Sequence, residues 1–105
     1  MANILEQYQL FQKETSIKNY NLTYLALGLG GEIGEVQNEI KKLERDNNNI
    51  LTVKKREQII LELGDAMWYF TGICNKLDCS LEDVLRQNIH KFIVSKFNKE
   101  SADEA

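Results

Sequence analysis

The sequence contains no proline, only one histidine and two cysteines, and no long run of apolar residues. No metal-binding motif uses Cys74 and Cys79, so we expect them to be an ordinary reduced pair. No apolar stretch approaches the length of a membrane span, and residues 1–10 lack a basic segment followed by an apolar run. We therefore expect a cytoplasmic chain with no membrane partner.

An excess of positive charge is also lacking. The chain has 13 Lys and Arg residues against 16 Asp and Glu residues, for a formal net charge of −3. That balance gives no electrostatic footprint for a nucleic-acid polymer, so long DNA or RNA is not an expected partner. With 105 residues, 43% of them hydrophobic, one domain is expected, and a domain this small often gains stability by forming a homo-oligomer.

Apolar residues recur at steps of three and four along most of the chain, which is the spacing of amphipathic helices. The clearest case is the series Leu25, Leu29, Ile33, Val36, Ile40 and Leu43. We expect four helices, at about 4–14, 22–45, 53–77 and from 81 onward. The predicted fold class is all-α, a four-helix bundle with no sheet.

Short polar residues mark the expected helix ends. The stretches 46–49 and 77–80 are the expected breaks, because such side chains compete for backbone hydrogen bonds. Thr52 is an expected N-cap, and Ser80 with Asp83 resembles a capping box. Residues 1–98 are expected to form a single domain, and the polar segment 99–105 a flexible tail.

Two pairs of acids stand out on the second and third expected helices. Glu32-Ile33-Gly34-Glu35 and Glu62-Leu63-Gly64-Asp65 repeat one pattern of acid, apolar residue, glycine and acid. Positions i and i+3 of a helix lie about 60° apart, so each pair presents two carboxylates on one face, beside the apolar stripe. One such pair is usually a solvated surface. Two matching pairs on helices that pack antiparallel would instead converge on one site.

Four converging carboxylates repel one another unless cations neutralise them. Ligands that are all oxygen suit Mg²⁺, or Mn²⁺, and argue against zinc. Mg²⁺ keeps several waters and commonly binds substrate phosphates. The acids Glu32, Glu35, Glu62 and Asp65 are therefore the predicted metal ligands of a site for phosphate chemistry.

Glycines on the same helices point to assembly. Gly30, Gly31 and Gly34 each cost roughly 1 kcal/mol relative to alanine within a helix. Gly34 and Gly64 lie away from the apolar stripe, with Leu27, Leu61 and Trp68. Helices that are small or apolar on both sides are usually buried all round. In so short a chain, a second copy is the simplest cover.

Other polar and aromatic residues leave alternatives open. Tyr69 lies one turn beyond Asp65 on the acid side, where its ring could meet a sugar or base or could simply pack. Asn88 falls on the apolar side of the fourth helix, where it could bind a ligand or satisfy a loop carbonyl. Lys91 and Lys96 offer cations on that helix, although most lysines only solvate a surface.

The spacing Glu32-x-x-Glu35, 26 intervening residues, then Glu62-x-x-Asp65 resembles the signature of the MazG-like nucleoside triphosphate pyrophosphohydrolases. The likeness runs from Leu25 to Phe97. It includes Trp68-Tyr69 after the second acid pair, and Ser80-Leu81-Glu82-Asp83 leading into Asn88-x-x-Lys91.

The resemblance implies an all-α NTP pyrophosphatase fold, completed as a homodimer or a dimer of dimers, with magnesium at the four acids. It implies hydrolysis of NTPs or dNTPs to the monophosphate and pyrophosphate. For such a reaction, Glu32 or Glu35 is the carboxylate that we expect to act as the catalytic base. Residues matching Tyr69, Asn88 and Lys91 contribute to the nucleotide pocket in that family, and Lys96 is a further substrate-binding candidate.

The chain also departs from the family pattern. Many members have an acid where this chain has Gly31, and many end the fourth helix in Arg-aromatic-Pro where this chain has Lys96-Phe97-Asn98. The first departure bears on the number of metal ions, and the second on how tightly the substrate phosphates are bound. The alternatives are a non-catalytic nucleotide-binding or regulatory module and a purely structural helical dimer. An intact set of four acids disfavours both.

Overall fold

The computed structural model describes residues 2–46 and 48–104, with side chains up to residue 99, and within these residues the chain is all-α, as predicted. It contains four helices and no strand in this part. The helices are α1 (Ile4–Thr15), α2 (Leu22–Asp46), α3 (Val53–Lys76) and α4 (Leu81–Glu104).

Side-chain caps explain where the helices start. Thr52 Oγ1 accepts a hydrogen bond from the Lys55 amide at 3.1 Å, and Ser80 Oγ accepts one from the Asp83 amide at 3.0 Å. Both predicted caps are thus confirmed. Asn21 Oδ1 does the same for α2, accepting from the Tyr24 amide at 2.8 Å.

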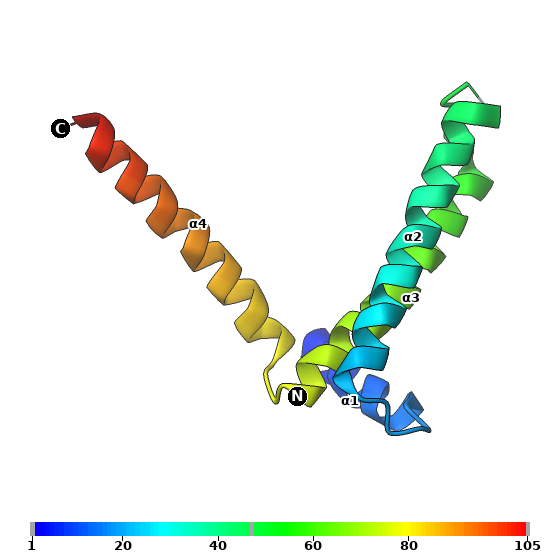
Figure 1. Ribbon diagram of the computed structural model, residues 1–105, viewed down its shortest axis with the longest axis horizontal. Coiled ribbons are helices and arrows are strands. Elements are labelled where there is room, and N and C mark those ends of the chain that lie inside the picture. Colours follow the sequence, from blue (N-terminus) through cyan, green and yellow to red (C-terminus); the bar gives the residue numbers. More distant parts are fainter. Residues whose placement is uncertain (1, 47, 105) are drawn as a thin grey trace.

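Left-handed residues end α2 and α3 at the predicted breaks. Asn48 and Asn49 have φ of 51° and 62°, and Asp78 has φ of 53°. Asn and Asp tolerate this region better than other residues that carry a Cβ. Asn47, part of the first predicted break, lies outside the described residues. Asn48 and Asn49 thus help to turn the chain from α2 into the antiparallel α3 (Figure 1).

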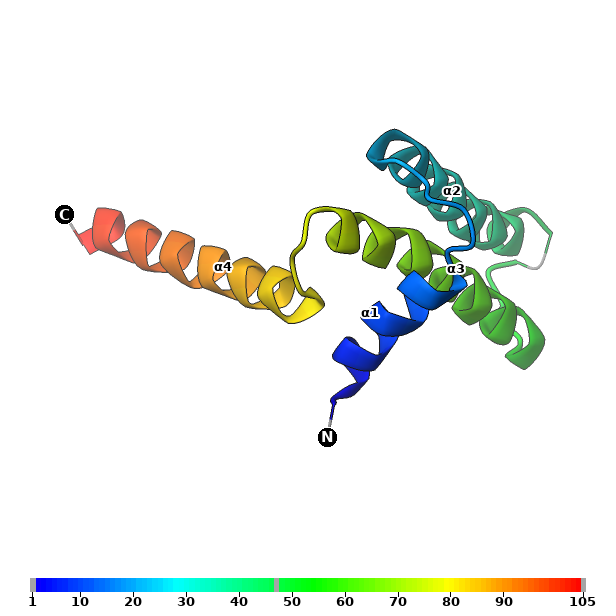
Figure 2. The same ribbon diagram turned by 90° about the horizontal axis from the view of Figure 1, so that it is seen from below.

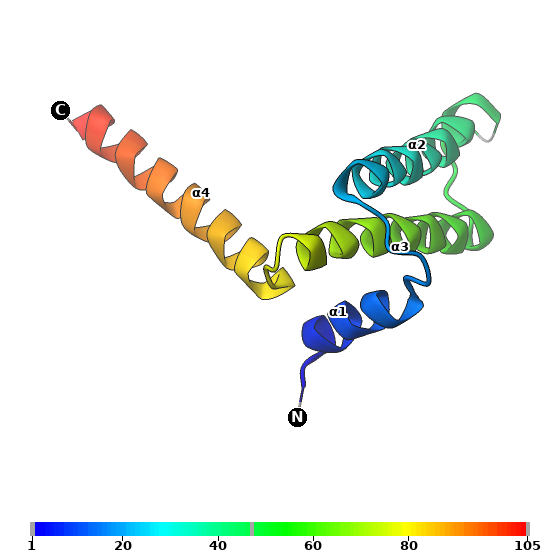
Figure 3. The same cartoon turned by 60° about the horizontal axis from the view of Figure 1, so that its bottom comes forward.

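The core lies mainly between α2 and α3, with α1 on the opposite side of α3 from α2 (Figures 2 and 3). Leu25, Val36 and Leu43 of α2 and Ala66 of α3 are buried. Gly72 lets three helices meet, because a Cβ there would lie 2.7 Å from Gln12 Nε2 of α1 and 3.0 Å from Leu25 Cδ2 of α2.

Polar side chains tie α1 to the α3–α4 turn. Gln9 Nε2 donates to Asn75 Oδ1 at 3.1 Å and to the Cys79 carbonyl at 3.0 Å, while Gln9 Oε1 accepts from the Leu81 amide at 3.0 Å. Leu81 itself is buried. These bonds fix the first residue of α4 against the rest of the chain.

Beyond its first turn, α4 leaves the other helices, so one chain alone does not form the predicted four-helix bundle (Figure 1). Apolar residues along α4 remain more than half exposed: Leu85, Ile89, Phe92, Ile93 and Phe97. On α2 and α3, the predicted core residues Ile33, Ile40 and Leu63 are also exposed. These apolar side chains stay exposed because nothing among the described residues of one chain covers them.

The C-terminal helix also extends further than expected. Residues 99–104 continue α4, past Asn98, where the sequence suggested the end of the domain. The domain boundary and the flexibility of the tail stay predictions.

Candidate metal and nucleotide site

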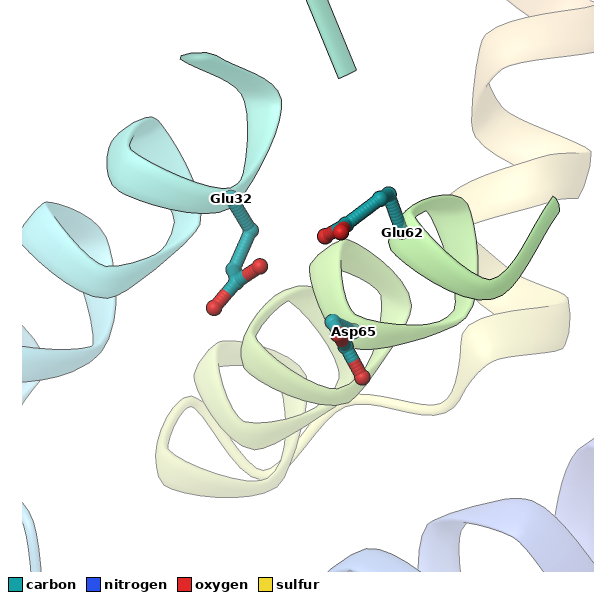
Figure 4. A group of neighbouring side chains, drawn as sticks. All are labelled: Glu32, Glu62 and Asp65. Atoms are coloured by element: carbon teal, nitrogen blue, oxygen red, sulfur yellow. The ribbon is translucent and has the colours of Figure 1, made fainter. Parts of the chain in front are cut away.

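Three of the four predicted acids meet where α2 packs against α3 (Figure 4). Glu32 projects from α2, and Glu62 and Asp65 project from successive turns of α3. One carboxylate oxygen from each lies within 4.8 Å of those from the other two. Glu32 and Glu62 are half-buried and Asp65 is exposed, so the cluster lies at the edge of the helix interface and opens to solvent.

Negative charge is uncompensated in this cluster, defined as Glu32, Glu62 and Asp65. None of the ion pairs formed among the described side chains involves any of the three. The pKa of Glu32 is raised, first by burial and then by the charges of Asp65, Glu62 and Glu35. A raised pKa means that the ionised form of Glu32 is disfavoured at this place. This is expected where several carboxylates lie together and no cation neutralises them.

Glu39 is an acid of the same helix interface that is paired with lysines and has a structural role. It is buried two turns along α2 from Glu32, and it receives Lys55 Nζ at 2.8 Å and Lys42 Nζ at 3.3 Å. Its pKa is lowered, mainly by the hydrogen bond from Lys55. Since the described side chains supply cations to Glu39 and none to the cluster, the two sets of acids have different chemistry.

Glu35, the fourth predicted acid, is exposed and lies outside the group of three. It follows Glu32 by one helical turn, and its charge contributes to raising the pKa of Glu32. Glu35 thus adds negative charge near the cluster without joining it.

Tyr69 lies beside the cluster, as its spacing from Asp65 predicts. Its ring rests on the backbone of α2 at Gly28, where an added Cβ would be only 2.2 Å from Cε1. Burial raises the pKa of Tyr69, and Tyr24, Glu32 and Asp65 add to the shift. Since Gly28 lies one turn after Tyr24 and one turn before Glu32, the Tyr69 ring lies between these two positions along α2.

Two tyrosines that the sequence did not single out also belong to this region. The pKa of Tyr8 in α1 is raised by burial and then by the charge of Asp65. Tyr24 precedes Glu32 by eight residues, so both lie on one helical face, and this spacing could have identified it. Tyr8 comes from a separate helix, and no local spacing in the sequence relates it to Asp65.

The structure does not bring the predicted residues of α4 to the acid cluster. Asn88, Lys91 and Lys96 are exposed on a helix that diverges from α2 and α3 (Figure 1). The expectation that Asn88 is buried on an apolar side was wrong for the single chain, because that side of α4 is uncovered. Asn88 and Lys91 line a shallow groove of about 460 Å³ with Cys79, Asp83, Val84 and Gln87.

Trp68 was expected on a side of α3 that a second copy of the chain covers. Its Nε1 instead donates to Thr15 Oγ1 of α1 at 2.8 Å. Gly30, Gly31, Gly34 and Gly64 face open space in the single chain, since a Cβ at any of them would meet no atom within 4 Å.

Comparison with known proteins gives one family. Residues 21–96 match the MazG nucleotide pyrophosphohydrolase domain, and this span contains all four acids, Tyr69, Asn88, Lys91 and Lys96. The Gene 37 protein of Mycobacterium phage L5 is 41% identical over 70 residues, which are 67% of this chain and 61% of that protein. The chain therefore matches about three fifths of the length of this relative. No solved structure matches. No helix in the described part of the chain is long and apolar enough to cross a membrane.

Proposed function

Because the chain belongs to the MazG nucleotide pyrophosphohydrolase family, we propose that it hydrolyses nucleoside triphosphates to nucleoside monophosphate and pyrophosphate with magnesium at its acid cluster. The observation that carries this proposal is the convergence of Glu32, Glu62 and Asp65 without a cationic partner among the described side chains. Ribonucleotides and deoxyribonucleotides are both candidate substrates, and nucleotide-pool house-cleaning is the proposed role.

The donor set fits magnesium. All three converging groups are carboxylates that open to solvent, which suits a hard ion that keeps several of its waters, and manganese has similar preferences. When bound, magnesium neutralises charge that develops on the phosphates and activates water for attack. Glu32, Glu62, Asp65 and, from the adjoining turn, Glu35 would hold it.

Proton transfer is the task we assign to a carboxylate on α2. Glu35 is exposed and lies outside the cluster, so its carboxylate is the one we assign to accept the proton of an attacking water. Glu32 is the alternative base, since it lies within the group. Attack at the α or the β phosphorus gives the same products.

Tyr69 is proposed to position the nucleoside. Its ring is held against Gly28 and lies beside Glu32, so a triphosphate at the acids would place the sugar next to the phenol. Fixed positioning of this kind contributes to rate because the reacting groups are oriented before reaction.

We propose that Asn88, Lys91 and Lys96 serve this site from a second copy of the chain. Within one chain they lie on the diverging α4, and the apolar stripe of that helix is exposed along its length. Exposed apolar residues on α2 and α3, Ile33 and Leu63 among them, provide a surface of matching character. A homodimer or a dimer of dimers would bury both surfaces and complete the four-helix bundle.

Product analysis tests the proposed function. A panel of NTPs and dNTPs is incubated with the protein and Mg²⁺, and products are separated by ion-exchange chromatography. Monophosphate and pyrophosphate in equal amounts are expected. Diphosphate with inorganic phosphate would contradict the proposed bond cleavage. Binding without turnover would support the alternative, a non-catalytic nucleotide-binding module.

A further inference from the structure

An aromatic series continues the acid cluster toward the start of α2. The ring of Tyr69 presses on α2 at Gly28, which lies one helical turn after Tyr24 and one turn before Glu32, so Tyr69 lies between these two residues along α2. The ring of Tyr20 stacks on that of Tyr24, with centroids 4.0 Å apart and planes inclined by 10°. The order along α2 is therefore acids, Tyr69, Tyr24 and Tyr20.

We propose that Tyr24, backed by Tyr20, is the platform on which the nucleobase of the substrate stacks. The inference rests on the proposed function, because it takes the acid cluster as the place of the phosphates. It adds a substrate-positioning role for two residues outside the metal-binding signature.

The spacing fits a nucleotide laid along α2 from Glu32 toward Tyr24. Tyr24 and Glu32 are eight residues apart on α2, which at 1.5 Å per residue is about 12 Å along the helix axis. Tyr69 lies between them, pressed against Gly28. A phosphate at Glu32 and a sugar at Tyr69 thus leave the base over Tyr24.

The exposure of Tyr24 suits ligand stacking better than core packing. Tyr24 is 47% exposed although its backbone amide is fixed by Asn21. Its position is thus set by the helix start and by the Tyr20 ring, and much of its surface is left free. Stacking on an aromatic ring tolerates every base, because every base has a π face. The platform therefore predicts broad acceptance of bases, with preference following stacking strength.

A fluorescent nucleotide tests the platform directly. The probe is a 2-aminopurine ribonucleoside triphosphate with a methylene bridge between the α and β phosphorus atoms, so binding is measured without turnover. Its fluorescence should be quenched on wild-type protein by stacking. Tyr24→Leu should abolish the quench and weaken binding about 5- to 150-fold, the range for losing one stacked base. Tyr24→Phe should retain both.

Two controls separate the base from the phosphates and from general damage. Tripolyphosphate, which has no base, should bind wild type and Tyr24→Leu equally. Phe11→Leu removes an equally exposed ring, at 47%, from α1 and should change nothing. Loss of quenching in Phe11→Leu or Tyr8→Leu, but not in Tyr24→Leu, would place the base on the α1 side and overturn the proposal.

A measurement on the unmodified protein covers the case in which Tyr24→Leu misfolds. Photo-crosslinking with 5-bromouridine triphosphate, followed by mass spectrometry, should attach the base to the peptide that contains Tyr20 and Tyr24. Attachment only elsewhere would overturn the platform while leaving nucleotide binding intact. If wild type binds neither the probe nor tripolyphosphate, the proposed function itself fails, and the platform fails with it.

Discussion

Gly28→Ala tests whether the contact between α2 and Tyr69 is as close as the structure has it. A Cβ at Gly28 would lie 2.2, 2.5 and 2.8 Å from three atoms of the Tyr69 ring. The ring is rigid, so it has to move as a unit by about 1 Å or more to reach ordinary contact. A displacement of that size in a positioning residue can cost about 100-fold in rate.

Gly30→Ala supplies the matched control. It lies on the same helix, and a Cβ there would meet no atom within 4 Å in the single chain. Both substitutions gain about 1 kcal/mol of helix propensity, whereas only Gly28→Ala adds overpacking, which typically costs about 1–3 kcal/mol. Gly28→Ala should therefore be less stable than Gly30→Ala by about 1–3 kcal/mol.

Urea unfolding at one protein concentration gives the stabilities, and kcat/KM for a nucleoside triphosphate gives the activities. Gly28→Ala should lose about 10- to 100-fold in kcat/KM, the loss that a ring displaced by about 1 Å implies, while Gly30→Ala keeps the wild-type value. Equal stability and equal activity in the two variants would refute the close contact and the positioning role of Tyr69 together.

Further predictions concern charge and assembly. In EDTA, Glu32→Gln should raise the Tm at pH 7 but not near pH 4. The raised pKa of Glu32 favours folding only while the carboxyl is protonated, and this stability is lost as the pH rises through the folded-state pKa. An equal gain in Tm at both pH values would show that the ionisation of Glu32 is not its cause. The opposite sign holds for Glu39, whose lowered pKa stabilises the fold above the unfolded pKa, so Lys55→Met should reduce the Tm at pH 7 more than at pH 3. Phe92→Glu, in the exposed apolar stripe of α4, should dissociate the proposed oligomer in a sedimentation experiment. His90→Glu, on another side of the helix, should not. A monomeric wild type with full activity would exclude a site shared between two chains.

The fold could be predicted from the sequence wherever a helix carries its own signals. Thr52 and Ser80 cap the helices that they were expected to cap, and the left-handed Asn48 and Asp78 fall within the predicted breaks. These features depend on residues within one turn of each other. Local spacing therefore contains the information that sets them.

The path of α4 could not be predicted in this way. Its apolar stripe, including Phe92, indicates burial but does not say whether the cover comes from the same chain or from another. Helical periodicity was misleading for α2 as well. It places Ile33 in the core, whereas in the structure Ile33 is exposed and Glu39, neutralised by Lys55, is buried. A long lysine from the facing helix makes an acid acceptable in the interface, and no pattern within α2 reveals that partner.

The sequence predicted which residues form the candidate site more fully than how they are arranged. The repeated acid pattern led to Glu32, Glu62 and Asp65, which converge, and also to Glu35, which stays outside the group. Their relation depends on how α2 is rotated against α3. Periodicity gives that rotation only to within about one side-chain position.

The most direct test of the account measures magnesium-dependent pyrophosphate release by wild type, Glu62→Gln and Glu57→Gln. Glu62 belongs to the acid cluster, whereas Glu57 is an exposed acid on the same helix, so the two changes remove the same charge in different places. Wild type and Glu57→Gln should release pyrophosphate in Mg²⁺ and stop in excess EDTA, and Glu62→Gln should be inactive while keeping its helical circular dichroism. Release by wild type that persists in EDTA, or a folded Glu62→Gln with the activity of Glu57→Gln, would contradict the central claim.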